Sequence, residues 1–196
     1  DNDDDDIVDA NDEGQLLISN SETKELLEKM RASLEYKPQS PFQICSTTKD
    51  EKGRRYLSWN GVGSIVSREE AVNNRIEIRF SDVDGNNRPE AFPDNYGFVM
   101  AALSYEGAMF ATSVDENEDE FSRQGSTLYY HAFPNQDHLG EANESFTTHL
   151  PTNEAAVAVA AGRGWVAVTT SERYLRVFSS TGLQTYIAFT KGEVVS

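Results

Sequence analysis

Cysteine is almost absent from the chain, and long hydrophobic runs do not occur in it. The one thiol, Cys45, has no partner for a disulfide bridge and cannot build a cysteine-rich zinc site. Such sparse use of cysteine is typical of a reducing compartment. No run of 18 apolar residues occurs, so we expect no membrane-spanning helix. The first residues, DNDDDDIVDA, lack the basic and apolar regions of a signal peptide, and we expect none there.

Basic residues are also scarce. The chain carries 17 lysines and arginines against 33 aspartates and glutamates, so its formal net charge is −16. This charge repels nucleic-acid phosphates, and we expect no direct contact of this segment with nucleic acid. It also argues against binding to a membrane surface, which requires clustered lysine and arginine. Enzymes and protein-binding modules remain as the functional classes.

The chain has none of the common catalytic or cofactor-binding motifs. Asp137, His138 and Glu141 have the residue types of a metal site, but their turn-rich surroundings favour a solvated loop. The glycines at 61–63 lack the third glycine and the following helix of a dinucleotide-binding loop, and no P-loop or nucleophile elbow occurs. We therefore expect no enzyme activity, no bound metal and no cofactor. The histidines, none in a zinc-binding spacing, are His131, His138 and His149.

The first 18 residues form an acidic segment. Eight of the first 15 residues are carboxylates, and like charges at this density oppose compaction. The pattern predicts a disordered tail over residues 1–18, with no structure of its own. The alternative is a short linear motif in which Ile7 and Val8 are the apolar anchors.

A helix is expected over residues 19–37. Ser19 and Glu22 have the spacing of a capping box, in which both side chains bond free amides at the helix start. Leu27, Met30 and Leu34 form one apolar stripe, which we expect to dock on the domain that follows.

From residue 41 onward, short β-rich runs replace the helical periodicity. The run at 75–80 alternates, so that Ile76, Ile78 and Phe80 share one face. Turn-forming residues separate the runs and no long helical pattern interrupts them, which favours an antiparallel meander. The stretch AAVAVAAGRGWVAVTTSERYLRVFSSTGLQTYIAFT contains four runs joined by three turns, the size of one propeller blade. Its first run consists of small residues, which suit an inner strand near a crowded channel.

These patterns predict an all-β fold: about half of a WD-repeat-like β-propeller at residues 41–196, preceded by the acidic tail and one short helix. We count about ten strands after residue 53, or two and a half to three blades. Closed propellers need at least four blades, so we expect the propeller to be incomplete in this chain. Within RRYLSWNGVGSIVS, Tyr56 and Trp59 are suited to packing between sheets, and Asn60 with Gly61 favours a tight turn.

Two separated stretches resemble one known family. PFQICST (41–47) leading to RRYLSWNGVG (54–63) resembles the entry into the SepB-domain propeller of the replisome adaptor family. This family includes chromosome transmission fidelity protein 4 of yeast and the acidic nucleoplasmic DNA-binding protein of animals, and we expect a fungal member. The final GEVVS resembles the family's next strand. Within 162–184 the residues that follow the family pattern are Gly162, Gly164, Trp165, Leu175, Arg176, Phe178, Gly182 and Gln184.

The resemblance implies a six-bladed propeller that forms a homotrimeric hub in the nucleus, associated with chromatin. Members of the family connect the replicative helicase, through a GINS subunit, to DNA polymerase α–primase and other clients, in DNA replication and sister chromatid cohesion. The helical bundle that captures clients has no counterpart in this sequence, so we assign no partner-binding residue. The resemblance implies structural roles for a set of motif residues, with tyrosine and tryptophan in the core and glycine at turns: Tyr56, Trp59, Gly63, Gly164, Trp165, Phe178 and Gly182.

Two alternatives stay open at the level of the sequence. One is a propeller adaptor from another pathway, such as ubiquitin ligation, because a fold does not fix a function. The other is an enzyme built on a propeller, which would need acids or histidines gathered at the channel mouth.

Overall fold

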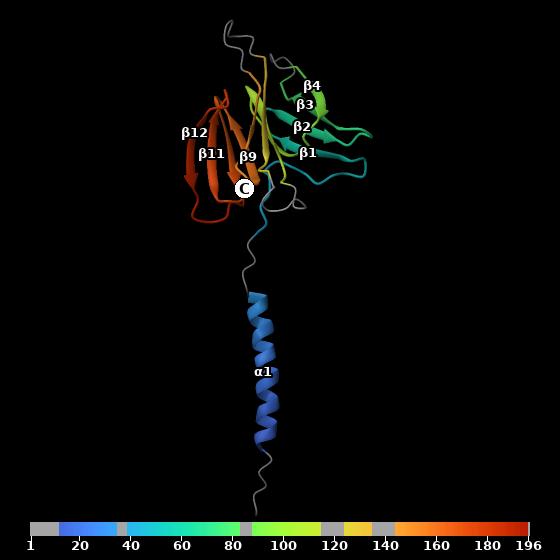
Figure 1. The fold of residues 1–196 in the computed structure, drawn as a ribbon. Helices are drawn as coiled ribbons and strands as arrows, with labels where there is room; N and C mark the ends of the chain where they lie inside the picture. Colours follow the sequence, from blue (N-terminus) through green and yellow to red (C-terminus); the bar gives the residue numbers. More distant parts are fainter. Residues whose placement is uncertain (1–11, 35–38, 83–87, 115–123, 135–143, 196) are drawn as a thin grey trace, which may run out of the picture. The chain divides into compact units, whose positions relative to one another are not determined.

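The computed structural model describes residues 12–34, 39–82, 88–114, 124–134 and 144–195, with side chains described from Thr23 onward. The chain divides into two compact units, Asp1–Gln39 and Ser40–Ser196. The first unit contains helix α1 (Asp12–Leu34), and the second is built from strands (Figure 1). None of the helical residues described here forms a segment apolar and long enough to cross a membrane.

Helix α1 begins earlier than the sequence indicated. Its first residue is Asp12 rather than Ser19, which corrects the prediction of disorder for residues 12–18. Residues 1–11 and 35–38 lie outside the described part of the chain. The disordered tail at 1–11 and the end of the helix at 35–37 therefore stay predictions. The stripe of Leu27, Met30 and Leu34 is exposed, and its docking stays a prediction.

The second unit consists of three four-stranded antiparallel sheets, and in each sheet the strands lie in chain order. The first sheet contains β1 (Arg54–Trp59), β2 (Gly63–Arg68), β3 (Asn74–Phe80) and β4 (Glu90–Asp94). The second contains β5 (Phe98–Leu103), β6 (Gly107–Thr112), β7 (Thr127–Ala132) and β8 (Phe146–His149). The third contains β9 (Ala156–Gly162), β10 (Trp165–Thr170), β11 (Tyr174–Ser179) and β12 (Gln184–Phe189). This confirms the predicted all-β fold, in which each sheet has the form of one propeller blade.

The described strands number twelve, compared with about ten expected from the sequence. One run, YLSWNGVGSIVS, contains both β1 and β2, because the turn at Asn60 and Gly61 divides it. The other missed strand is β4, whose sequence EAFPD contains a proline and two acids. Proline is tolerated there because β4 is the outer strand of its sheet, where a missing N–H interrupts no further ladder.

The first strand of each sheet lies on the inside of the unit. β5 contacts β1 and β2 of the first sheet, and β9 contacts β5 and β6 of the second. The alanine-rich strand β9 is therefore an inner strand, as its small residues predicted. Side chains between the sheets form two cores, one on each side of the second sheet. Leu57, Ile65 and Phe110 are fully buried in one of them, and Tyr130, Met109 and Val168 in the other.

Candidate interaction site

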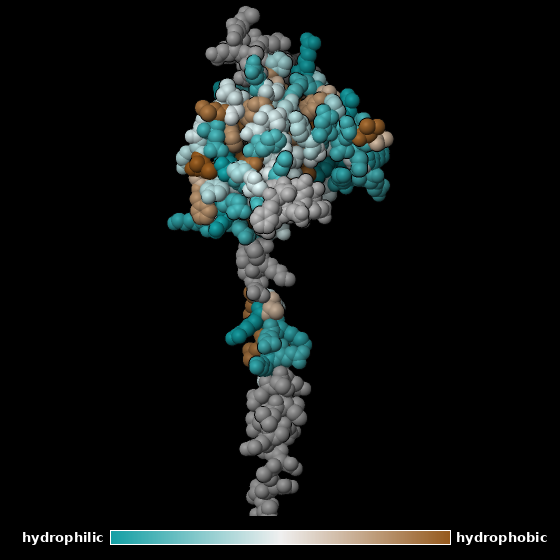
Figure 2. Space-filling view, viewed as in Figure 1, coloured by the Kyte–Doolittle hydropathy of each residue, from teal (hydrophilic) through white to brown (hydrophobic). Residues whose placement is uncertain are grey.

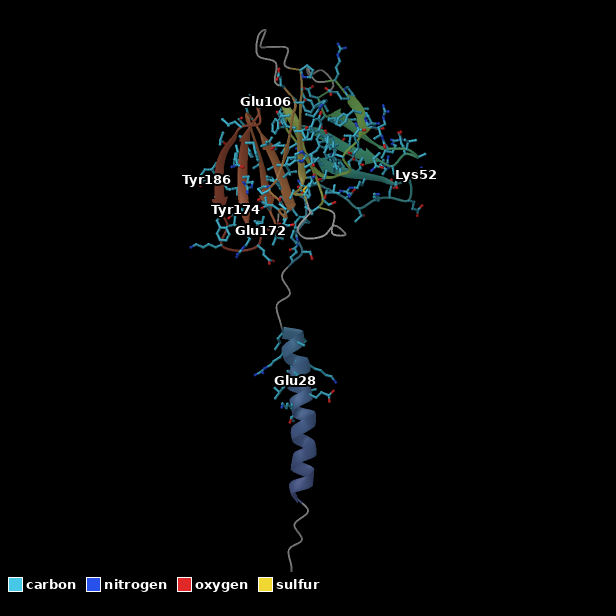
Figure 3. All side chains as sticks on the ribbon, viewed as in Figure 1. Glu28, Lys52, Glu106, Glu172, Tyr174 and Tyr186 are labelled. Atoms are coloured by element: carbon cyan, nitrogen blue, oxygen red, sulfur yellow. The ribbon has the colours of Figure 1, made fainter. Side chains whose placement is uncertain are left out.

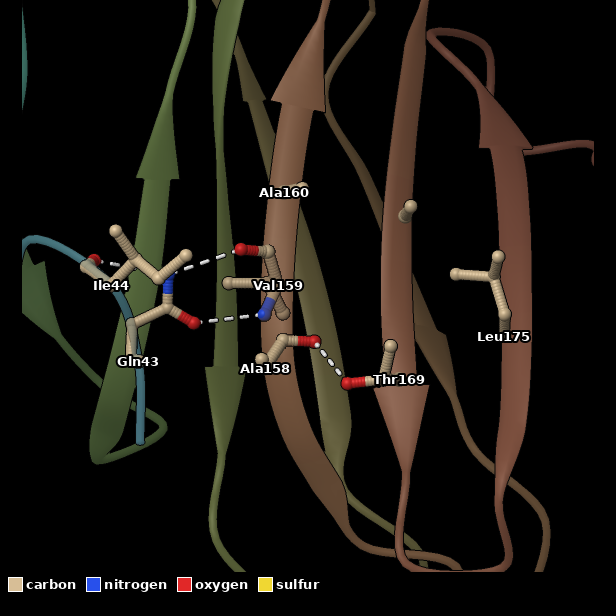
Figure 4. Close-up of a pocket in the computed structure, with 8 residues that line it drawn as sticks. Gln43, Ile44, Ala158, Val159, Ala160, Thr169 and Leu175 are labelled. Atoms are coloured by element: carbon tan, nitrogen blue, oxygen red, sulfur yellow. Dashed lines mark hydrogen bonds between the residues drawn. The ribbon is translucent and has the colours of Figure 1, made fainter. Parts of the chain in front are cut away.

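The side chain of Gln43 joins two inner strands. Its Nε2 donates hydrogen bonds to the carbonyl oxygens of Ala101 in β5 (3.2 Å) and Val159 in β9 (3.0 Å). Its Oε1 accepts a bond of 2.8 Å from the N–H of Val159 (Figure 4). The N–H of the preceding residue, Phe42, donates to the carbonyl of Val195 over 2.8 Å. The segment that enters the sheets is thus bonded to both inner strands and to the last described residues.

Sequence reasoning gave Gln43 no role beyond its place in the PFQ motif. Its bonding partners lie 58 and 116 residues later in the chain. A polar residue in a loop carries no local signal for such distant partners. The family-like motif around it was the only feature that marked this position.

A hollow of about 270 Å³ lies beside Gln43, on the face of the third sheet that is turned away from the second. No charged side chain is among the residues that line it, so the hollow can bury apolar groups but offers no acid, base or nucleophile for catalysis. Its lining consists of Gln43, Ile44, Ala158, Val159, Ala160, Ala167, Thr169 and Leu175 (Figure 4).

The outward face of the third sheet is apolar over its full width. The strand register places Ala160, Ala167 and Val177 in one row across this face, followed by Tyr186 at the outer strand. Trp165 lies on the same face, beside Gly162, where an added Cβ would collide with the indole ring. A row of small and apolar residues is suited to close packing against another sheet.

The outward face of the first sheet is charged. Glu77 in β3 forms ion pairs with Arg68 (3.4 Å) and Arg79 (3.1 Å). Tyr56 and Trp59 stack on one another, with their ring centroids 5.5 Å apart. The two outward faces of the unit therefore differ in chemistry, and surfaces that cover them must differ as well.

The structure changes the predicted roles of the two tryptophans. Trp59 and Trp165 were expected in the core, but their side chains are 64% and 44% exposed. Both lie on the outward faces of the terminal sheets, where Trp59 contacts Tyr56 and Trp165 contacts Gly162 but a large part of each side chain stays exposed. Phe178 is buried in the core between the second and third sheets, and Tyr56 is half-buried.

The motif glycines lie where other residues would be strained. Gly164 and Gly182 have φ angles of 74° and 86°, in the left-handed region that favours glycine, and each lies in a turn between strands. Gly63 lies so close to β3 that an added Cβ would collide with the carbonyl oxygen of Arg79. The amide of Gly164 also donates a bond of 2.6 Å to Glu106, which ties the second sheet to the third.

The described histidines belong to structural contacts. His131 in β7 bonds Glu90 in β4 through Nε2 (2.5 Å) and the hydroxyl of Tyr129 through Nδ1 (3.2 Å), so it ties the first sheet to the second. His149 bonds the hydroxyl of Thr127 over 3.1 Å. His138, together with the metal site considered around it, lies outside the described residues. Within the described ranges, no three side chains of metal-ligand type come together.

One half-buried cation was not singled out from the sequence. Arg55 in β1 donates a hydrogen bond to the carbonyl of Val99 in β5, and its Nε has no partner. Burial lowers the pKa of the Arg55 guanidinium. Cys45, by contrast, is exposed and unpaired, as expected from the cysteine count.

The second unit coincides with a known family segment. A family model described as "Minichromosome loss protein, Mcl1, middle region" matches residues 40–196. This chain belongs to that family. The match confirms the resemblance found in residues 41–63 and 162–184, while the fungal origin stays a prediction. The three sheets are thus the Mcl1 middle region of this protein.

Individual relatives of the Mcl1-family chain come from plants, animals and fungi. It is 37% identical over 165 residues to the protein Enhancer of LHP1 1 of Arabidopsis thaliana, which covers 84% of this chain and 16% of that protein. It is 28% identical over 158 residues to WD repeat and HMG-box DNA-binding protein 1 of Homo sapiens, covering 81% and 13%. It is 34% identical over 132 residues to minichromosome loss protein 1 of Schizosaccharomyces pombe, covering 66% and 15%. The chain therefore spans only a small part of the length of these relatives.

Proposed function

We propose that this chain is part of a non-catalytic scaffold of DNA replication in the nucleus. Membership of the Mcl1 family carries the proposal, because one relative is named for minichromosome loss and another for DNA binding. The geometry supports a structural role, since His131 with Glu90 and Gly164 with Glu106 join neighbouring sheets, and no charged side chain lines the hollow beside Gln43. In this proposal the protein has no enzyme activity and needs no cofactor.

The proposed mechanism is multivalency. Three copies form a homotrimeric hub on chromatin, and the hub holds the GINS subunit of the replicative helicase together with DNA polymerase α–primase. Several binding sites on one rigid oligomer raise the effective concentration of the tethered enzymes. The same hub would act in sister chromatid cohesion. The two buried cores between the three sheets support this role, because a hub must hold its clients at a fixed separation.

The proposal includes a closed ring of six blades, of which the described sheets are three. The apolar outward face of the third sheet supports closure of the ring, because exposure of an apolar sheet face to water is unfavourable. Another apolar sheet would cover it. The blade that packs against the first sheet would instead present a polar surface, with hydrogen-bonding or charged partners for Arg68, Glu77 and Arg79.

The first test is the solution mass of the chain, measured by size-exclusion chromatography with light scattering. A longer chain, extended beyond Ser196, is measured beside it. We expect the longer chain to have three times the mass of its monomer. A monomeric longer chain would overturn the trimeric hub and favour a single-copy adaptor from another pathway.

The second test addresses the partners. Purified GINS complex and DNA polymerase α–primase are each titrated into the longer chain, and binding is measured by mass photometry. We expect both to bind one trimer at the same time. If neither binds, the replication role fails even if the trimer forms, and an adaptor role in another pathway becomes the better explanation.

A further inference from the structure

The outer strand of the third sheet exposes large apolar side chains. Tyr186, Ile187 and Phe189 in β12 are 59%, 44% and 57% exposed. β12 pairs with β11 on one side, and the order of the sheet ends there. An edge strand turns alternate N–H and C=O groups away from its neighbour, where a further strand can bond to them. Tyr186 lies along this margin in Figure 3, and hydrophobic surface appears there in Figure 2.

The three outer strands differ in how far they resist such pairing. β4 contains Pro93, which lacks an N–H and so discourages the addition of a strand. β8 is only four residues long. β12 has six residues, QTYIAF, with neither proline nor charge. Among the described outer edges, β12 alone lacks a feature that blocks pairing.

Closure of a ring would leave this edge open. Neighbouring blades of a propeller pack face against face, while the edge of each outer strand points away from the ring. A further blade would therefore cover the outward face of the third sheet but not the backbone groups at the rim. Ile187 pairs with Arg176 and Phe189 with Tyr174, so both lie on the face turned toward the second sheet. A blade on the opposite face would not bury them.

The chemistry of the edge favours a peptide over a second copy of the chain. A six-residue strand pairing buries much less surface than the roughly 1,200 Å² of a stable interface between folded proteins. An extended peptide needs less area, because its main-chain bonds supply affinity and its alternate side chains supply specificity.

We propose that the open edge of β12 binds an extended segment of a client protein as a fifth strand of the third sheet. The segment carries large apolar side chains at alternate positions, which pack beside Ile187 and Phe189 on one face and Tyr186 on the other. Main-chain hydrogen bonds to the edge hold it in place. This inference rests on the proposed scaffold role, to which it adds a site for clients.

The probe for the test is a peptide with the sequence of residues 174–180, YLRVFSS. This sequence is chosen because β11 pairs antiparallel with the other edge of β12, so its alternating side chains are compatible with those of β12. The labelled peptide is titrated into the 196-residue chain, and binding is followed by fluorescence anisotropy. We expect saturable binding. A peptide with proline in place of Val177 should not bind, because proline removes an N–H and disrupts the strand.

Two lysine substitutions locate the binding site. Ile187→Lys and Tyr186→Lys, on opposite faces of β12, should each weaken binding about fivefold by removing an apolar cross-strand pair. Thr147→Lys, at an exposed position of β8, is the matched control and should leave binding unchanged. Circular dichroism checks that each variant is folded, and two variants are used in case one is not.

Three outcomes would overturn the inference: no saturable binding, equal binding of the proline peptide, or undiminished binding by both folded β12 variants. The result is separable from that of the scaffold proposal. A chain that binds the strand probe at β12 but no replication factor would retain the peptide-binding edge and lose the replisome role.

Discussion

The guanidinium of Arg176 in β11 forms a two-pronged ion pair with Glu154, in the segment that leads into β9. Nε donates to Oε1 over 2.8 Å, and the second bond, to Oε2, is 2.6 Å long. The two side chains are only 12% and 3% exposed. Arg176 also lies over the ring of Tyr174, 5.3 Å from its centroid, and donates to Gln184 over 3.1 Å. Arg176, one of the residues that follow the family pattern, thus joins β11 to the segment that begins the third sheet.

Removal of one partner of this pair should destabilise the protein strongly. Glu154→Leu leaves the Arg176 guanidinium largely buried without a counter-charge, and we expect a loss of about 3 kcal/mol in the free energy of unfolding. Urea unfolding followed by tryptophan fluorescence measures it. The double variant with Arg176→Leu should recover much of the loss, because two apolar residues leave no buried charge.

The matched control is Glu69→Gln, which breaks the exposed pair between Glu69 and Lys49, 3.3 Å apart. We expect a change below about 0.5 kcal/mol, since exposed ion pairs contribute little. Equal effects of Glu154→Leu and Glu69→Gln would contradict the role of the buried pair.

The contact of Gln43 with the inner strands gives a second prediction. Gln43→Leu has similar volume but leaves the N–H of Val159 without its partner, and we expect a loss of about 2 kcal/mol. Hydrogen exchange should show a specific increase at the Val159 amide. Gln43→Glu can still accept from that amide but places an oxygen against two carbonyls, so it should not restore stability. Gln39→Leu, at an exposed position, is the control.

The fold was predictable where a pattern is local. Alternation at 75–80 predicted β3, and the small residues at 156–162 predicted an inner strand. β4 was missed because its proline and acids oppose strand formation in isolation, and its place at the edge of a sheet is a property of the whole fold. The helix start was misplaced because the capping-box spacing of Ser19 and Glu22 predicted a start seven residues after the first helical residue, Asp12.

The candidate site was harder to predict because it depends on distant contacts. Nothing near Gln43 in the sequence identifies Ala101 or Val159 as its partners. Trp59, from its size, and Trp165, from the family resemblance, were expected in the core, but their exposure depends on which surface covers the outward faces. β12 was recognised as a strand, yet its position at an open edge follows only from the order of the sheet.

Gly107 provides a test of packing in the second sheet, with Gly61, in the turn between β1 and β2, as the control. A Cβ added at Gly107 would collide with the ring of Tyr130 and lie 2.7 Å from the carbonyl oxygen of His131. Tyr130 is fully buried and cannot move aside, so Gly107→Ala should cost about 2 kcal/mol through overpacking. Gly61→Ala, where nothing lies within 4 Å of the added atom, should change stability by less than about 0.5 kcal/mol. Thermal unfolding distinguishes the two, and equal melting temperatures would contradict the predicted collision.

The buried hydroxyl of Tyr130 should make the protein sensitive to alkaline pH. Burial raises the pKa of Tyr130 to about 12, with a smaller contribution from the nearby Glu106 carboxylate. The ordinary pKa of tyrosine is about 10, so the unfolded chain releases this proton first as the pH rises. Below pH 10 the phenol is neutral in both states and its effect on stability is constant. Between pH 10 and about 12 ionisation favours the unfolded state, and stability is lost.

The predicted test compares Tyr130→Phe with the exposed control Tyr186→Phe. Tyr130→Phe keeps the ring but has no proton to release, so its free energy of unfolding should fall less steeply above pH 10 than that of the natural chain. Tyr186→Phe should leave the steep fall in place. Urea unfolding at a series of pH values measures the slopes, and absorbance at the phenolate wavelength follows ionisation directly. If the free energy of unfolding falls equally steeply with pH in the natural chain and in Tyr130→Phe, the prediction is contradicted. Water would then reach this hydroxyl, and the core between the second and third sheets would be less closely packed than the contact of Tyr130 with Gly107 requires.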